Sequence, residues 1–133
     1  MEFLGKKAAS APTKSATAQQ KGQAAEALAL AHLQAAGLRL LARNYRTPGR
    51  GGGEIDLIVR DRDGTVVFVE VRSRSRRDFG GAGASINAAK QRRIILAARH
   101  YLMRLSTPPP CRFDAVLIDG ETLQWVRAAF DAS

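Results

Sequence analysis

The segment from Gly53 to Arg74 constrains the fold of this 133-residue chain more than any other. It holds two runs rich in β-branched residues, 53–59 and 65–74, on either side of an Asp63-Gly64 pair that is typical of a tight turn. The pattern predicts two antiparallel strands joined as a hairpin. A chain of this length has room for one domain, and we expect its core to form around this hairpin.

The predicted hairpin carries acidic side chains among apolar ones. Because side chains alternate between the two faces of a strand, Glu54, Asp56 and Ile58 should share one face of the first strand. The corresponding face of the second strand should carry Val66, Phe68, Glu70, Arg72 and Arg74. Carboxyl groups are therefore expected on a surface that is otherwise partly apolar.

The register of the hairpin brings two of these acids together. A turn over residues 62–64 with Gly64 left-handed sets Asp56 directly opposite Glu70. Like charges in such a pair, with Cβ atoms about 4.5–5.5 Å apart, destabilise a sheet unless a positive charge intervenes. Mg²⁺ favours carboxylate oxygens and keeps water on its other positions. The pair predicts either a divalent-cation site or a simple ion pair between Glu70 and Arg72.

Charge and cysteine content narrow the classes of partner. Lys and Arg total 21 against 12 Asp and Glu, a net charge of +9, which favours a nucleic acid, DNA first, over a membrane. The chain has no apolar run of transmembrane length and its first seven residues lack a signal-peptide core, so we expect a cytoplasmic protein. With one cysteine, Cys111, and two histidines, any metal must use oxygen ligands. The oligomeric state is left open, with a homodimer among the options.

Composition divides the chain into three parts. Residues 1–18 are rich in Ala, Ser, Thr and Lys without an apolar period, which predicts a disordered basic arm. Residues 19–128 carry the periodic segments and should form a single α/β domain. Residues 129–133 are expected to be a short tail.

The first half of the domain should place one more acid near the sheet. Ala, Leu and Gln from Gln19 to Ala36 predict a helix that stops at Gly37. Glu26 lies at the edge of its apolar stripe and is either a solvated residue or a functional one. Leu38 to Tyr45 should form an edge strand. The glycine-rich loop 47–53 is either a flexible connector or a place where backbone approaches a ligand closely.

The second half of the domain should contain a helix that crosses over the sheet. Ile86 to Leu105 predicts a helix with Ile94, Ala98, Tyr101, Leu102 and Leu105 on its apolar face. Lys90 stands near the start of that face, where it either extends to solvent or reaches the carboxylates. Residues 112–118 and 123–126 should be strands, the first parallel to its neighbour. The predicted fold is α/β, a mixed sheet flanked by helices in αβββαβ order.

Several arginines could contact the phosphates of a nucleic acid, with a merely solvated surface as the alternative. The candidates are Arg46, Arg50, Arg74, Arg76, Arg77, Arg92 and Arg93.

These motifs together resemble the YraN-like proteins. The resemblance runs from about Lys21 to Val126 and is carried by Glu26, Gly53-Glu54-Ile55-Asp56-Leu57-Ile58, Phe68-Val69-Glu70-Val71-Arg72, Lys90 and Arg112-Phe113-Asp114, with Asn44 and Arg46 also fitting. It implies a restriction-endonuclease-like core of the PD-(D/E)xK nucleases, similar to archaeal Holliday junction resolvases. It further implies that Asp56, Glu70 and Glu26 act on Mg²⁺ or Mn²⁺. Glu54 belongs to the motif without an assigned role.

One position departs from the superfamily pattern. Arg72 stands where the motif carries lysine, and an arginine stays charged, so it cannot accept a proton from water. Either the cation alone activates the water, or Lys90 has taken the lysine's role, or activity is lost. The expected function is a metal-dependent endonuclease that hydrolyses phosphodiester bonds in branched or structured DNA. The alternative is a non-catalytic nucleic-acid-binding or partner-binding module.

Overall fold

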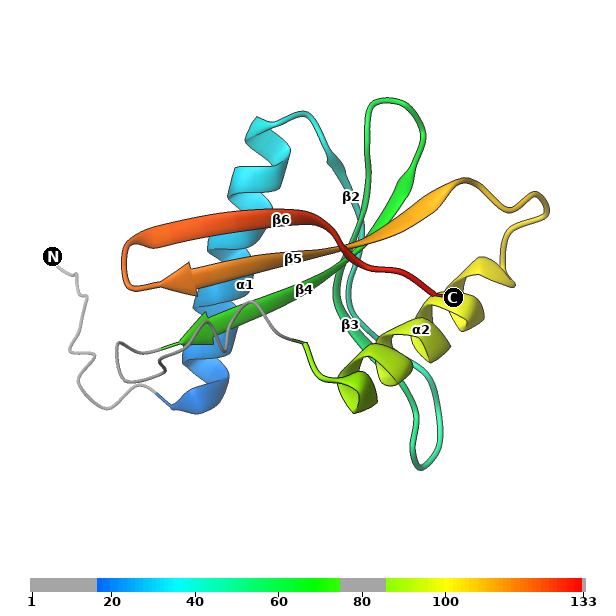
Figure 1. Cartoon of the computed structure of the whole chain (residues 1–133), viewed down its shortest axis with the longest axis horizontal. Coiled ribbons are helices and arrows are strands. Elements are labelled where there is room, and N and C mark those ends of the chain that lie inside the picture. Colours follow the sequence, from blue (N-terminus) through cyan, green and yellow to red (C-terminus); the bar gives the residue numbers. More distant parts are fainter. Residues whose placement is uncertain (1–16, 75–85, 133) are drawn as a thin grey trace, which may run out of the picture.

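Two helices cover opposite faces of a five-stranded sheet in the computed structural model, which describes residues 17–74 and 86–132 (Figure 1). The elements follow one another as α1 (Ala18–Ala35), β2 (Arg39–Arg46), β3 (Glu54–Arg60), β4 (Val66–Arg74), α2 (Ala88–Leu102), β5 (Cys111–Asp119) and β6 (Thr122–Phe130). The strands lie side by side in chain order, β4 and β5 are parallel, and the other three pairings are antiparallel. The predicted α/β class with a mixed sheet is confirmed, and the fold is consistent with a restriction-endonuclease-like core.

Each face of the sheet has its own core. Ala25, Ala29 and Leu33 of α1 pack on the face that carries alternate apolar residues such as Val67 and Val69. On the other face, buried residues of α2 pack on a second set, which consists of Ile55, Ile58, Val66, Phe68, Phe113, Ala115 and Leu117. The alternation of side chains along β4 thus assigns its odd-numbered apolar residues to α1 and its even-numbered ones to α2.

The two helices begin at polar caps. Thr17 and Gln20 form a reciprocal capping box at the start of α1. Of the predicted arm, Ala18 therefore belongs to this helix and Thr17 caps it, while residues 1–16 lie outside the described residues. Asn87 caps α2, which ends at Leu102. Leu105, predicted on the apolar face of this helix, therefore follows it and is 37% exposed. Neither described helix has the length and apolarity needed to span a membrane.

The hairpin between β3 and β4 has the predicted register. Asp61 N–H donates to the Thr65 carbonyl at 2.8 Å, and Gly64 takes a left-handed φ of 93°. The pairing then continues to Leu57 opposite Val69. Because α2 crosses over the sheet, β5 returns parallel to β4, as predicted. Strand β6 reaches Phe130, into the segment expected to be a tail.

Candidate active site

Strands β3 and β4 separate at the position of the predicted acidic pair (Figure 1). Their backbone pairing ends at Leu57 and Val69, and one further step of the same register places Asp56 opposite Glu70. Instead of another backbone bond, the Oδ2 of Asp56 accepts the Val71 N–H at 2.8 Å. The carboxyl group therefore lies at the opening between the strands and takes the place of a backbone acceptor.

This separation breaks the simple alternation expected along β3. Ile55 and Ile58 are three residues apart, yet both are fully buried in the core beneath α2. Simple alternation, which would put Ile55 and Ile58 on opposite faces, therefore does not hold in this part of the strand. The physical reason is that β3 leaves β4 here and pairs only with β2, where Asn44, opposite Asp56, has a left-handed φ of 50°.

The two carboxyl groups at the opening interact strongly. Glu70 is 6% exposed, and none of the described N–H or hydroxyl groups reaches its buried Oε1. Burial first, and then the charge of Asp56, raise the pKa of Glu70 to about 8. Burial also raises the pKa of Asp56, while the Val71 N–H and a hydrogen bond from Glu70 act in the opposite direction. At neutral pH the protonated form of Glu70 is therefore favoured.

A lysine from α2 reaches this pair. The Nζ of Lys90 lies 3.6 Å from the Oε2 of Glu70, and its side chain is 31% exposed. The Lys90 backbone N–H donates a hydrogen bond to the side chain of the cap residue Asn87 at 2.8 Å. This bond fixes the position of the Lys90 backbone at the start of α2. Of the two alternatives for Lys90, solvent or the carboxylates, the structure places it at the carboxylates. Arg72 also lowers the pKa of Glu70, but less than Lys90 does.

Glu26 approaches the same acids from the opposite helix. Burial first, and then the charge of Asp56, raise the pKa of Glu26. With its amide nitrogen turned toward α1, Asn44 donates to both carboxyl oxygens of Glu26 at 3.2 Å. This role of Asn44 is absent from the sequence prediction, and the only signal for it is the fit of Asn44 to the family pattern.

Glu54 and the glycine-rich loop lie beside these acids. The Oε2 of Glu54 is 3.6 Å from the guanidinium of Arg46. The loop is closed by a bond from Thr47 N–H to the Gly53 carbonyl at 3.0 Å and by one from Gly53 N–H to the Thr47 hydroxyl at 2.7 Å. A Cβ at Gly53 would collide with the carbonyl oxygen of Arg93, so this glycine is required for packing against α2.

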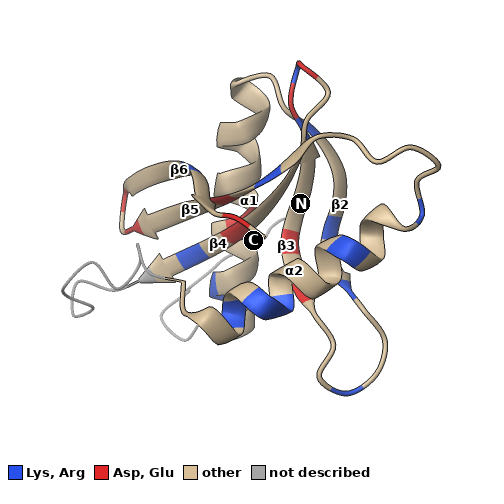
Figure 2. Cartoon of the chain, turned by 45° about the vertical axis from the view of Figure 1, so that its right-hand side comes forward, with Lys and Arg blue, Asp and Glu red and all other residues tan. Residues whose placement is uncertain are grey.

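The candidate phosphate-binding arginines divide into two groups. Arg46 and Arg93 border the glycine-rich loop, and Arg50 and Arg92 are exposed nearby on the loop and on α2. Figure 2 shows the basic segments of α2 next to the acidic segments of β3 and β4. Arg76 and Arg77 lie outside the described residues, and Arg74 is described only as the last residue of β4.

The acids at the strand opening are candidate ligands for a divalent cation. Within residues 17–74 and 86–132, no three Asp, Glu, His or Cys side chains converge closely enough to form a complete cage. Mg²⁺ does not need one, because it is commonly held by one or two carboxylates and water. The adjacent carboxyl groups of Asp56 and Glu70, with the Oε1 of Glu70 buried and unpartnered, fit such an ion. Glu26 is bound to Asn44 rather than to this pair.

Another acid of the predicted motif has a structural role. Asp114 is fully buried and accepts hydrogen bonds from Arg112 Nε at 3.0 Å, Trp125 Nε1 at 2.9 Å and Ala128 N–H at 2.9 Å. Arg112 also binds Asp61 of the hairpin at 3.1 Å. This network ties β6 to β5 at the irregular pairing near Phe113. Asp114 is therefore a structural residue, in contrast to Asp56 and Glu70.

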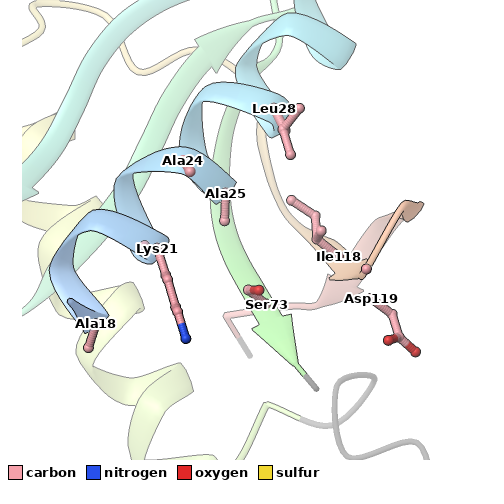
Figure 3. Close-up of a pocket in the computed structure, with 10 residues that line it drawn as sticks. Ala18, Lys21, Ala24, Ala25, Leu28, Ser73, Ile118 and Asp119 are labelled. Carbon is pink, nitrogen blue, oxygen red and sulfur yellow. The ribbon is translucent and has the colours of Figure 1, made fainter. Parts of the chain in front are cut away.

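A hollow of roughly 700 Å³ lies between α1 and the ends of β4 and β5, away from these acids (Figure 3). Its lining is mainly small or apolar and includes Ala25, Leu28 and Ile118, with Lys21 and Asp119 also present. Among the described residues of its lining, Asp119 is the one acid. The opening between β3 and β4 is therefore the better candidate for an active site.

The fold and the acids at the strand opening define an α/β protein with a restriction-endonuclease-like core. Residues 25–118 match the model of the "Uncharacterised protein family UPF0102", and the chain belongs to this family, which is the YraN-like group. It is 75% identical to a UPF0102 protein of Paracidovorax citrulli over 87% of this chain and 86% of that one. It is also 68% identical to one of Acidovorax sp. strain JS42 over the whole of both chains.

Proposed function

We propose that this protein is a metal-dependent endonuclease of the PD-(D/E)xK type that hydrolyses phosphodiester bonds in DNA. The observation that carries the proposal is the placement of Asp56 and Glu70 at the opening between β3 and β4, with Lys90 Nζ 3.6 Å from Glu70. Two carboxyl groups and a lysine at one opening of the sheet provide ligands for a cation and a positive charge for a phosphate. The raised pKa of Glu70 also supports a functional site.

Each of these residues has a distinct proposed role. Asp56 and Glu70 would hold Mg²⁺ or Mn²⁺, with Glu26 beyond them, and the bound ion would supply Lewis acidity and lower the pKa of water. Glu70 must release its proton before it can serve as a ligand. Lys90 would bind a nonbridging oxygen of the scissile phosphate and stabilise the negative charge that develops there.

Arg72 has a more limited role in this proposal. An arginine side chain is not a general base, so Arg72 would orient phosphate oxygens. The role of the missing motif lysine is assigned to Lys90, which approaches from α2.

The proposed substrate is DNA that is recognised through its backbone. A net charge of +9 and exposed arginines on the loop and on α2 support phosphate contacts, which carry no base sequence. Together with the resemblance to junction resolvases, they favour branched or otherwise structured DNA as the target in the cytoplasm.

A panel of linear, forked and four-way DNA tests this function directly. We expect cleavage with Mg²⁺ or Mn²⁺, no cleavage in EDTA, and binding without cleavage by Asp56→Asn. Glu121→Gln, at an exposed turn position, is the matched control and should cleave like the wild type. No cleavage of any substrate with either metal would contradict the proposal.

A non-catalytic DNA-binding module is the second candidate. The observation that favours it is Arg72 at the position of the motif lysine, beside a Glu70 whose pKa of about 8 disfavours the charged, metal-binding form. In the same panel, binding in EDTA without cleavage under either metal would select this candidate.

A further inference from the structure

A hollow of roughly 270 Å³ lies between the loop 47–53 and α2, beside the candidate active site. It is bordered by Arg46, Glu54 and Arg93 and by the backbone of the glycines in the loop. Glu54 is two residues before Asp56 on β3, so the rim of the hollow adjoins the acids. The phosphate contacts proposed above do not specify which phosphate of the DNA would bind here.

The loop that forms the hollow has a defined shape. Its ends are joined by the two hydrogen bonds between Thr47 and Gly53, and Gly49 and Gly51 have left-handed φ values of 89° and 67°. Residues other than glycine rarely adopt this backbone conformation. Turns of this kind can direct backbone N–H groups toward an anion. The loop therefore provides a fixed wall that a charged group could approach closely.

Two guanidinium groups face this wall with weak contacts. The Nε of Arg93 is 3.4 Å from the Gly52 carbonyl, a long hydrogen bond, and the Arg46 guanidinium is 3.6 Å from Glu54. The Arg46 side chain is 71% exposed. Each guanidinium has five N–H donors in a fork that matches a phosphate, and each contact above uses a small part of them. A phosphate could thus bind without dismantling a strong interaction.

The position of Arg93 relates the hollow to the acids. Arg93 follows Lys90 by three residues on α2, which corresponds to about 4.5 Å along the helix axis and to nearly the same side of the helix. Lys90 contacts Glu70, and the carbonyl of Arg93 contacts the loop at Gly53. If the scissile phosphate of a nucleic acid strand lies at Lys90, the next phosphate along that strand would therefore lie over the hollow.

We propose that this hollow is a binding subsite for the phosphate adjacent to the scissile one, formed by Arg93, Arg46 and the loop 47–53. The ligand class is a nucleic acid strand with phosphates on consecutive nucleotides, and the identity of the neighbouring phosphate rests on the proposed nuclease function. Glu54 then has a role that the motif alone does not assign. Its ion pair holds the exposed side chain of Arg46 at the rim of the subsite.

The test uses thymidine 3′,5′-bisphosphate, which carries two phosphates on one nucleoside and has no internucleotide bond to cleave. In Mg²⁺ we expect it to bind at least tenfold more tightly than thymidine 5′-monophosphate and to shift the backbone amide resonances of Gly51 to Gly53. Arg93→Gln should remove both the affinity difference and these shifts. Arg99→Gln, at an exposed position on the same helix, is the matched control and should retain both.

Two results would overturn the subsite. Unshifted amides of Gly51 to Gly53 in a protein that cleaves DNA would contradict the subsite and leave the nuclease function standing. Equal affinity for the two nucleotides, with the loop amides shifted in both, would show an anion site that is not coupled to the acids, and this would contradict the placement.

Discussion

Lys90 Nζ and Glu70 Oε2 lie 3.6 Å apart, across the space between α2 and β4. The other oxygen of Glu70, Oε1, is buried without a described hydrogen-bond partner, and the charge of the neighbouring Asp56 carboxyl raises the pKa of Glu70. This carboxyl group is thus bordered by a cation on one side and by a second acid on the other. Its state of ionisation should control stability, metal binding and activity.

The first prediction concerns pH. A carboxyl group whose pKa rises from 4.5 in the unfolded chain to about 8 in the folded one holds its proton longer in the folded state. In EDTA, the free energy of unfolding should therefore fall as pH rises from about 4.5 to about 8, by at most about 1.4 kcal/mol per pH unit from this group. Urea unfolding at several pH values measures this slope. Glu70→Gln should flatten it, and an unchanged slope would contradict the assignment to Glu70.

The second prediction concerns Asn44. Asn44→Asp would place a carboxylate about 3 Å from Glu26, and at pH 8 it should destabilise the protein by roughly 1 kcal/mol. The loss should be smaller at pH 5, because the raised pKa of Glu26 lets it take up a proton. Asn44→Gly keeps the left-handed backbone and is the control for loss of the amide alone. An Asn44→Asp variant as stable as the wild type at pH 8 would show that the amide does not bind Glu26.

The third prediction separates the two cations near Glu70. Lys90→Met keeps an apolar stem for packing and should lower kcat for DNA cleavage at least 100-fold, with about 3 kcal/mol of transition-state stabilisation lost. Arg72→Lys should preserve or raise activity, because it restores the motif residue. Single-turnover kinetics measure both, and the thermal midpoint verifies the fold. A Lys90→Met variant that cleaves normally would remove Lys90 from the mechanism.

The fourth prediction distinguishes the structural acid from the acids of the site. Asp114→Asn should destabilise the protein by about 3 kcal/mol, because the partly buried Arg112 loses a counter-charge and the network loses bonds. The folded fraction should still bind Mn²⁺ like the wild type. Urea unfolding and Mn²⁺ titration provide the two measurements. Loss of metal binding in a folded Asp114→Asn protein would place Asp114 in the site.

Local sequence signals predicted much of the fold. The Asp63-Gly64 turn predicted the hairpin register, because a short turn leaves few alternatives, and the pairing from Arg60–Val66 to Leu57–Val69 confirms it. The mixed sheet followed from a helix between two β-rich segments, which requires a crossover. These features depend on residues close together in the chain.

The features that sequence did not predict depend on distant contacts. The separation of β3 from β4, which leaves Ile55 and Ile58 in one core, arises where β3 continues to pair with β2 alone. Gly53 is required by the carbonyl of Arg93, 40 residues away along the chain, so its purpose was not visible as a local pattern. The burial of Asp114 depends on donors from two strands.

Calorimetric titration of Mn²⁺ into the metal-free protein at pH 7 tests the central claim most directly. We expect one ion to bind with release of close to one proton, detected by repeating the titration in buffers of different ionisation enthalpy, because Glu70 must lose its proton to become a ligand. Asp56→Asn and Glu70→Gln should each weaken binding at least tenfold, while Glu121→Gln should not. A wild-type protein that binds no Mn²⁺, or that binds it equally after both substitutions, would contradict a metal site at the opening between β3 and β4.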